Sequence, residues 1–162
     1  MTKITPNGTT KLKTIFPWLL VILWMAVIFY LSHQPATQSS HLSSGVAELI
    51  MNILEKITPS GMIDFELFHH FVRKNAHFFA YLILGILVVN AIKKDKGISI
   101  PAAALICILY AASDEFHQTF IPGRAGQLMD VLIDSSGSIV GILLYKSIDI
   151  FKGKLLKVKE PM

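Results

Sequence analysis

The sequence predicts an all-α membrane protein, a bundle of four transmembrane helices with an amphipathic surface helix between the first and the second. The chain has 162 residues, of which 52% are hydrophobic and only 16% are charged, and its mean hydropathy is +0.55. This composition is too apolar for an ordinary soluble domain, and the length suggests one domain over residues 1–162. Four apolar segments are the expected helices: Phe16–Leu31, Phe78–Ile92, Ile98–Ala112 and Val131–Tyr145.

The first helix is expected over about residues 15–33. Lysines at positions 3, 11 and 13 precede its apolar segment, as they would in a signal peptide. No small-residue cleavage site follows, and more apolar segments come later in the chain. We therefore interpret this segment as a retained membrane helix.

An amphipathic helix is expected over about residues 44–57, where apolar side chains recur at three- and four-residue spacing. Ser44 is a candidate N-cap, and the Pro59–Gly61 stretch ends the pattern. The helix either lies on the outer membrane surface or packs on the bundle as an ordinary helix. The apolar positions are Val46, Leu49, Ile50, Ile53, Leu54 and Ile57.

The remaining helices are expected over about residues 66–92, 98–119 and 129–150. Every apolar segment is shorter than the ~20 residues that cross a bilayer core, since about 15 residues cover only roughly 22 Å. A soluble all-α protein with buried helices is the alternative. If the helices do span, each must continue into a polar flank to complete the crossing, and the four flanks meet at one level: Ser32–Gln34, Arg73–His77, Ser113–Gln118 and Asp130–Asp134.

The distribution of charge favours the membrane interpretation. With a cytoplasmic N-terminus and four spans, eleven of the 15 basic residues fall on the inner side, whereas eight of the 11 acids and all six histidines fall on the outer side. This positive-inside bias predicts a multi-pass protein of the cell membrane, with both termini cytoplasmic and the polar helix ends facing outward. Cytoplasmic anchoring explains the net charge of +4, and nothing indicates nucleic acid binding.

The polar flanks suggest a functional site, because ionisable groups at membrane depth are costly. An Asp beside a His can act as a general base with its orienting partner. The candidate catalytic residues are Asp114, His117, His77 and Glu115. The candidate substrate-binding residues are Arg124, Lys74, Gln118, Tyr81 and Gln34. Among them, the Arg124 guanidinium suits a phosphate or a carboxylate.

Asp130 and Asp134 lie four residues apart, on one face of the last helix. They are expected to stabilise charge or, with a histidine, to hold a divalent cation. No spacing here matches a strong metal motif such as H-E-x-x-H, so the metal remains one alternative. On the same helix, Gly137 and Gly141 form a small-residue pattern that favours close helix contact.

Several of these residues fall into two longer motifs. The pattern K-x-x-H-F-x-x-Y-x-x-L-G covers Lys74–Gly85, and D-E-x-x-Q-x-F-x-P-G-R covers Asp114–Arg124. The chain thereby resembles the VanZ-like family, named for a protein linked to teicoplanin resistance, over nearly its whole length. One departure is Asp134, where many relatives have Asn. The resemblance implies a small polytopic membrane protein and supplies no reaction.

Three functions are compatible with these observations. The first is an enzyme that acts on a lipid-linked or cell-envelope substrate at the outer leaflet, with a link to glycopeptide resistance suggested by the family. The second is a binding or accessory protein for a lipid headgroup, a glycopeptide or an envelope enzyme. The third is a purely structural role, in which the polar groups lock the helices together.

Overall fold

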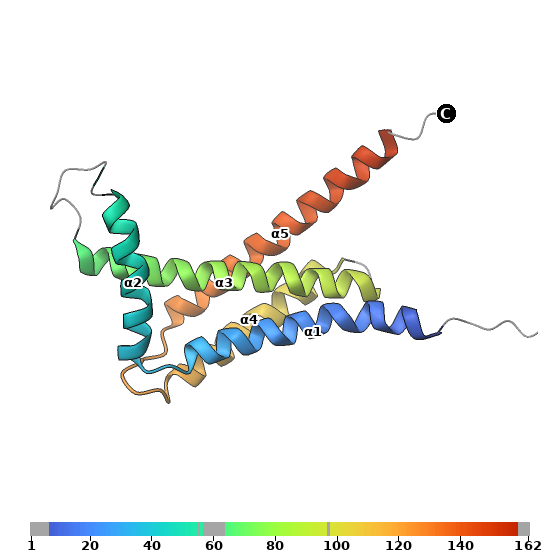
Figure 1. The fold of residues 1–162 in the computed structure, drawn as a ribbon. Coiled ribbons are helices and arrows are strands. Elements are labelled where there is room, and N and C mark those ends of the chain that lie inside the picture. The colour runs from blue at the N-terminus through green and yellow to red at the C-terminus, as the bar shows by residue number, and fades with distance from the viewer. Residues whose placement is uncertain (1–6, 55, 57–63, 97, 159–162) are drawn as a thin grey trace, which may run out of the picture.

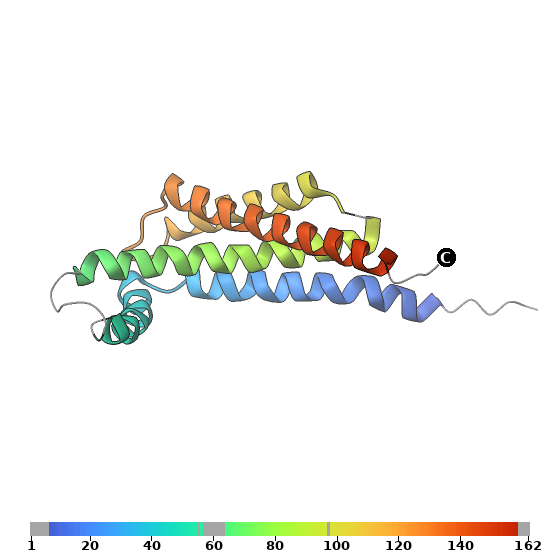
Figure 2. The same ribbon diagram turned by 90° about the horizontal axis from the view of Figure 1, so that it is seen from above.

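The computed structural model describes residues 7–54, 56, 64–96 and 98–158, and within them every regular element is an α-helix. Successive long helices α1, α3, α4 and α5 run in alternating directions, and α2 crosses one end of the group (Figures 1 and 2). The bounds are α1 (Asn7–Ser32), α2 (Ala36–Leu54), α3 (Phe65–Lys96), α4 (Ile100–Gln118) and α5 (Leu128–Val158).

Three of the described helices are long and apolar enough to cross a membrane, at Thr14–Ser32, Phe65–Lys93 and Leu128–Lys154. The predicted all-α membrane character is confirmed to this extent. α4 is not among the three, because the acids and the histidine of its last two turns offset its apolar start. Its outward face is nevertheless apolar, and Leu105 and Leu109 are 58% and 61% exposed. The fourth span therefore stays a prediction.

The helices extend beyond the apolar segments that predicted them. α1 begins at Asn7 and α5 continues to Val158, where about 15 and about 150 were expected. Both extensions are rich in lysine, which is a good helix former, so the helix continues where the apolar pattern stops.

α2 begins at Ala36, eight residues before the expected cap at Ser44. No helix breaker follows Pro35 until residue 45, so the polar residues before the apolar pattern also become helical. The expected end, near residues 57–61, lies outside the described residues. Val46, Leu49 and Ile53 are at least half exposed, as a helix on a membrane surface requires.

α3 and α5 approach each other closely at two glycines of α5. A Cβ atom at Gly137 would lie 2.3 Å from the carbonyl oxygen of Phe78, and one at Gly141 would lie 2.1 Å from that of Leu82. No larger residue fits at these positions without moving a backbone. The close contact predicted from the small-residue pattern is confirmed.

The core lies where α1, α3, α4 and α5 meet, and it includes the buried side chains of Leu84, Cys107 and Ile142. Two cross-helix hydrogen bonds flank it. Trp24 donates from Nε1 to the Ala80 carbonyl at 2.9 Å, and Tyr110 donates from its hydroxyl to the Met25 carbonyl at 2.6 Å. Together with the glycine contacts between α3 and α5, these bonds limit the rotation of the four helices about their axes, and thereby decide which polar residues face one another.

Candidate functional site

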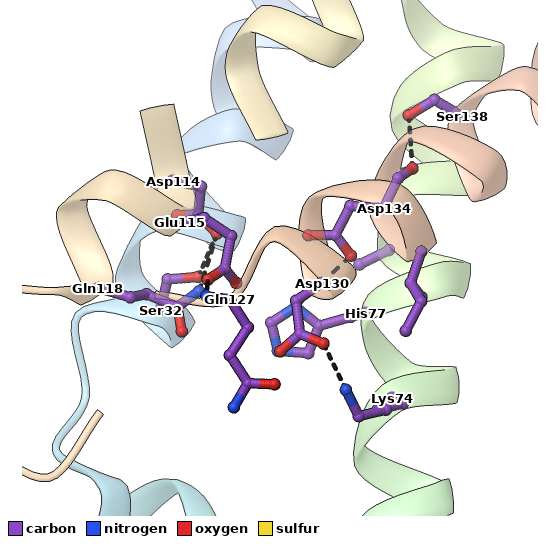
Figure 3. A network of polar contacts seen from close by, with 12 residues as sticks. Ser32, Lys74, His77, Asp114, Glu115, Gln118, Gln127, Asp130, Asp134 and Ser138 are labelled. Carbon is purple, nitrogen blue, oxygen red and sulfur yellow. Dashed lines mark hydrogen bonds and ion pairs between the residues drawn. The ribbon is translucent and has the colours of Figure 1, made fainter. Parts of the chain in front are cut away.

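The polar helix ends gather at one end of the protein, where α1 ends, α3 begins, α4 ends and α5 begins (Figure 1). The turn between α4 and α5 closes this end, because the Ala36 N–H at the start of α2 donates to the Pro122 carbonyl at 3.2 Å. Figure 3 shows the polar side chains in two neighbouring groups, one around Asp114 and one around Asp134.

The first group is a chain of hydrogen bonds that starts at Asp114, which is 2% exposed. Its Oδ2 accepts a bond of 2.7 Å from the Ser32 hydroxyl and one of 3.3 Å from Gln118 Nε2. Gln118 Oε1 in turn accepts from Arg124 Nη1 at 2.9 Å. The buried carboxylate thus fixes the amide of Gln118, and that amide fixes the guanidinium.

Glu115 holds the connection between α4 and α5. Its Oε2 accepts a 2.9 Å hydrogen bond from the backbone N–H of Gln127 (Figure 3). The other carboxylate oxygen is buried and has no hydrogen-bond partner among the residues described. This contact lets Glu115 position the start of α5, and its expected catalytic role stays a prediction.

The second group joins α3 to α5. Lys74 forms a half-buried ion pair with Asp130. One turn deeper, His77 Nδ1 lies 3.7 Å from Oδ1 of the fully buried Asp134. That distance is too long for a hydrogen bond, and neither Asp134 oxygen has a hydrogen-bond partner in the described chain. A buried carboxylate that has an imidazole beside it but makes no hydrogen bond to the described residues therefore lies at the base of the site (Figure 3).

The expected pair between Asp114 and His117 is not formed. Asp114 faces α1 and binds Ser32, whereas His117 lies 3.1 Å from His33, between Nε2 and Nδ1, and packs against the Phe29 ring. His117 therefore belongs to an aromatic cluster at the outside of α1 and α4. Of the two candidate histidines, His77 is the one that faces a buried acid.

Two cavities adjoin at this end of the protein. The polar one, of about 210 Å³, lies between α3, the α4–α5 turn and the start of α5. The apolar one, of about 220 Å³, lies between α1, α2 and α3. Arg73, His77 and Arg124 line both. These three side chains therefore stand at the boundary between a polar and an apolar space.

The charges in the polar cavity are unequal, because three permanent cations (Arg73, Lys74 and Arg124) line it with two carboxylates (Asp130 and Asp134). Burial lowers the pKa of Arg124 from its ordinary value, and the nearby charge of Arg73 acts in the same direction. An anion between the two guanidinium groups would relieve this repulsion.

A sequence model of the VanZ/LLP1 family matches residues 16–152. The chain belongs to the VanZ/LLP1 family. No curated protein and no solved structure matches it significantly. The VanZ/LLP1 match contains every residue of both polar groups, and the family resemblance expected from the two motifs is confirmed.

The other expected site residues of this VanZ/LLP1 protein are less available to a ligand in the polar cavity. Tyr81 is fully buried and lines the apolar cavity. Gln34 is buried at the end of α1 and lines neither cavity. Lys74 lines the polar cavity but is engaged by Asp130.

No three His, Cys, Asp or Glu side chains of the described residues converge on a point where they could hold a metal ion. Asp130 is neutralised by Lys74, which leaves Asp134 and His77 as an incomplete ligand set. The residues present therefore do not fit the divalent cation that was one expectation for this site.

Arg73 is the site residue that the sequence argument did not select. It lies next to Lys74 in the chain, and a helical face could have contained either residue. One signal in the sequence could have identified it. Asp130 pairs with only one of the two neighbouring cations, Lys74, and Arg73 is then left without an ion-pair partner among the described residues. That pairing depends on how α3 is rotated against α5.

Proposed function

We propose that the protein binds an anionic, lipid-linked substrate of the cell envelope and exchanges a proton with it at His77. One observation carries this proposal. Arg73 and Arg124 line one cavity, and no carboxylate of the described chain lies within ion-pair distance of either. Charged groups this close to apolar surroundings need a counter-ion, and guanidinium groups are suited to phosphate or carboxylate.

The proposal places the site at the outer leaflet. The lysine-rich ends of α1, α3 and α5 lie at the opposite end of the molecule from the polar groups, and lysines favour the cytoplasmic side. With α4 as a fourth span, both termini are cytoplasmic. The exposed apolar face of α4 supports this arrangement, since it would otherwise contact water.

His77 is the proposed proton donor or acceptor, because it lines the polar cavity and lies beside a buried carboxylate. Asp134 places a buried acid 3.7 Å from that imidazole, where it can stabilise charge that develops there during proton exchange. Asp114 acts at a distance, through Gln118 and Arg124, as a positioning residue.

A binding protein without turnover is the second candidate. It is favoured by the 3.7 Å separation of His77 and Asp134, which is longer than an oriented catalytic pair needs. Teicoplanin combines a polar head with a lipid tail, so a glycopeptide is one ligand that this candidate includes.

Envelope-lipid mass spectrometry tests the proposal. Cells expressing wild type, His77→Gln, Arg73→Gln or Arg124→Gln are compared at matched membrane abundance, with Lys152→Gln, an exposed residue near the end of α5, as the control. A lipid that changes mass with wild type and Lys152→Gln only would establish turnover.

If no lipid changes mass, the anionic lipids that co-purify with each variant are compared. Loss of a lipid from the two arginine variants alone would support the binding candidate. Equal lipid content in all five proteins would reject both candidates and leave the structural role.

A further inference from the structure

The apolar cavity is the feature that the proposed function leaves unused. It lies between the last turns of α1, the first three turns of α2 and residues 72–81 of α3. Six apolar side chains contribute to its lining: Ile28, Leu31, Val46, Val72, Ala76 and Ala80.

A hydrogen bond holds the α2 wall of this cavity in place. The Ser43 hydroxyl lies 2.6 Å from His69 Nε2, which joins the middle of α2 to the first turns of α3. Ser43 itself lines the cavity. Because a side-chain contact fixes the two helices, the space between them is present before any ligand binds.

The apolar cavity also opens toward lipid. Leu31 and Val46 line it and are 48% and 50% exposed, and the neighbouring apolar side chains of α1 and α2, such as Tyr30 and Leu49, are 66% and 65% exposed. In a membrane these surfaces contact hydrocarbon. An acyl or prenyl chain can therefore pass from the bilayer into the cavity without crossing water.

The side chains that line both cavities determine which kind of ligand fits. A molecule whose anionic group contacts Arg73 and Arg124 has the apolar cavity immediately beside that group. A carboxylate has two oxygens, and one guanidinium can engage both. A phosphate has further oxygens, so two guanidinium groups can share it.

We infer that the two cavities together form the site of a lipid phosphate, with the phosphate between Arg73 and Arg124 and one hydrocarbon chain in the apolar cavity. This inference rests on the proposed function and adds the substrate class. The polar cavity of about 210 Å³ admits a phosphate with a small substituent and excludes a large glycan from its interior.

Photocrosslinking to the purified full chain tests where the hydrocarbon lies. The probe is hexadecyl phosphate with a diazirine group on a carbon near the phosphate. Crosslinks are expected on the cavity walls, at Val46, Val72 or Ala76. Labelling spread evenly over the outward faces, such as Leu109 and Leu132, would overturn the assignment of the cavity.

Substitutions that fill the cavity give a second test. Ala76→Phe places a ring in the apolar cavity, and the control Ala112→Phe changes an exposed alanine of α4 that lines neither cavity. Affinity is measured for ethyl, butyl and octyl phosphate. Each methylene buried in the wild type is expected to raise affinity by up to about fourfold.

Ala76→Phe should remove this dependence on chain length and leave ethyl phosphate binding unchanged, whereas Ala112→Phe should keep it. If Ala76→Phe does not fold, Val46→Trp with Val140→Trp as its control replaces the pair, since both valines are partly exposed. An unchanged dependence in a folded cavity variant would overturn the inference.

The arginine variants separate this inference from the proposed function. Arg73→Gln should weaken every alkyl phosphate about equally, because it removes a headgroup contact. One outcome is that Arg73→Gln weakens binding while chain length has no effect on the affinity of the wild type. The headgroup site is then supported with free phosphate as its ligand, and the hydrocarbon site is rejected. If Arg73→Gln changes nothing, the headgroup site and the lipid-phosphate inference are both rejected.

Discussion

Ser32 at the end of α1 donates a 2.7 Å hydrogen bond to Asp114 near the end of α4, and both side chains are buried. Gln118 and Arg124 extend this contact to the polar cavity. Asp114 does not line that cavity itself. The relationship makes Asp114 the anchor of Arg124.

Ser32→Ala should destabilise the protein, because Asp114 Oδ2 loses its shorter hydrogen bond inside an apolar environment. The expected cost is about 1 kcal/mol, as for other buried hydrogen bonds and for those between membrane helices. Ser136→Ala is the control, since its hydroxyl is exposed and bonds only its own helix, at the Ile133 carbonyl. Thermal unfolding in detergent measures both variants. Equal shifts would contradict a special role for the Ser32–Asp114 contact.

Gln118→Met should weaken anion binding, because it keeps the side-chain volume and removes the acceptor for Arg124 Nη1. It also removes the 3.3 Å hydrogen bond to Asp114 Oδ2, so a loss of stability no larger than that of Ser32→Ala is expected. A loss of about tenfold in affinity corresponds to one charge-assisted hydrogen bond of roughly 1.4 kcal/mol. Gln38→Met, on the exposed face of α2, is the control. Binding of octyl phosphate is the measurement.

The same substitution in an Arg124→Gln background isolates the positioning role. If Gln118 acts through Arg124, then Gln118→Met should have no further effect once the guanidinium is absent. An additive loss in the double variant would instead mean that Gln118 contacts the ligand itself.

The gathering of the polar residues at one end of the helices could be predicted from the sequence, whereas their pairing could not. The apolar segments are too short to cross a bilayer, so four spanning helices would have to bring their polar flanks to one level. Which side chains touch depends on helix rotation, and adjacent residues such as Arg73 and Lys74 point about 100° apart on a helix. The glycine contacts and the Trp24 and Tyr110 hydrogen bonds fix that rotation.

The Asp114–His117 pair shows the same limit. Three-residue spacing put both residues on one face of α4, but a face is broad enough to meet two partners. Asp114 meets Ser32, and His117 meets His33 one residue further along the chain. Spacing within one helix predicts neighbours on that helix and leaves their partners on the next helix undetermined.

His77→Phe should destabilise the fold, because it removes the imidazole beside Asp134 and leaves a fully buried carboxylate without it. The Asp134 carboxylate makes no hydrogen bond to the described residues that could be lost, so the cost comes from the lost ion-pair contact, and about 3 kcal/mol is expected when a buried charge loses its partner. Asp134→Asn in the same background should recover most of the loss by removing the charge. His70→Phe, exposed on the same helix, is the control. Failure of Asp134→Asn to rescue would show that the imidazole matters for packing alone.

Gly141→Ala should separate α3 from α5, since the added Cβ would lie 2.1 Å from the Leu82 carbonyl oxygen. The helices must shift, and overpacking of this kind typically costs about 1–3 kcal/mol. Gly153→Ala is a matched control on the same helix, with no heavy atom within 4 Å of its added Cβ. It should be neutral or slightly stabilising, because alanine is the better helix former. Similar melting temperatures for the two variants would contradict the close α3–α5 contact.

The proposed orientation in the membrane can be tested with single cysteines. Cys107 is the natural cysteine of the chain and is buried, so new exposed cysteines can be labelled over a low background. His41→Cys on α2 and Gln127→Cys before α5 should react with a membrane-impermeant maleimide in intact cells. Lys152→Cys near the end of α5 should react only after permeabilisation.

Ser99→Cys decides whether α4 spans, because Ser99 precedes its first residue and Gln127 follows its last turn. Four spans require the two positions to label from opposite sides of the membrane. Labelling of both from outside would mean that α4 does not cross. Labelling of Gln127→Cys only after permeabilisation would place the two arginines at the cytoplasmic face, and the ligand would then have to come from the inner leaflet.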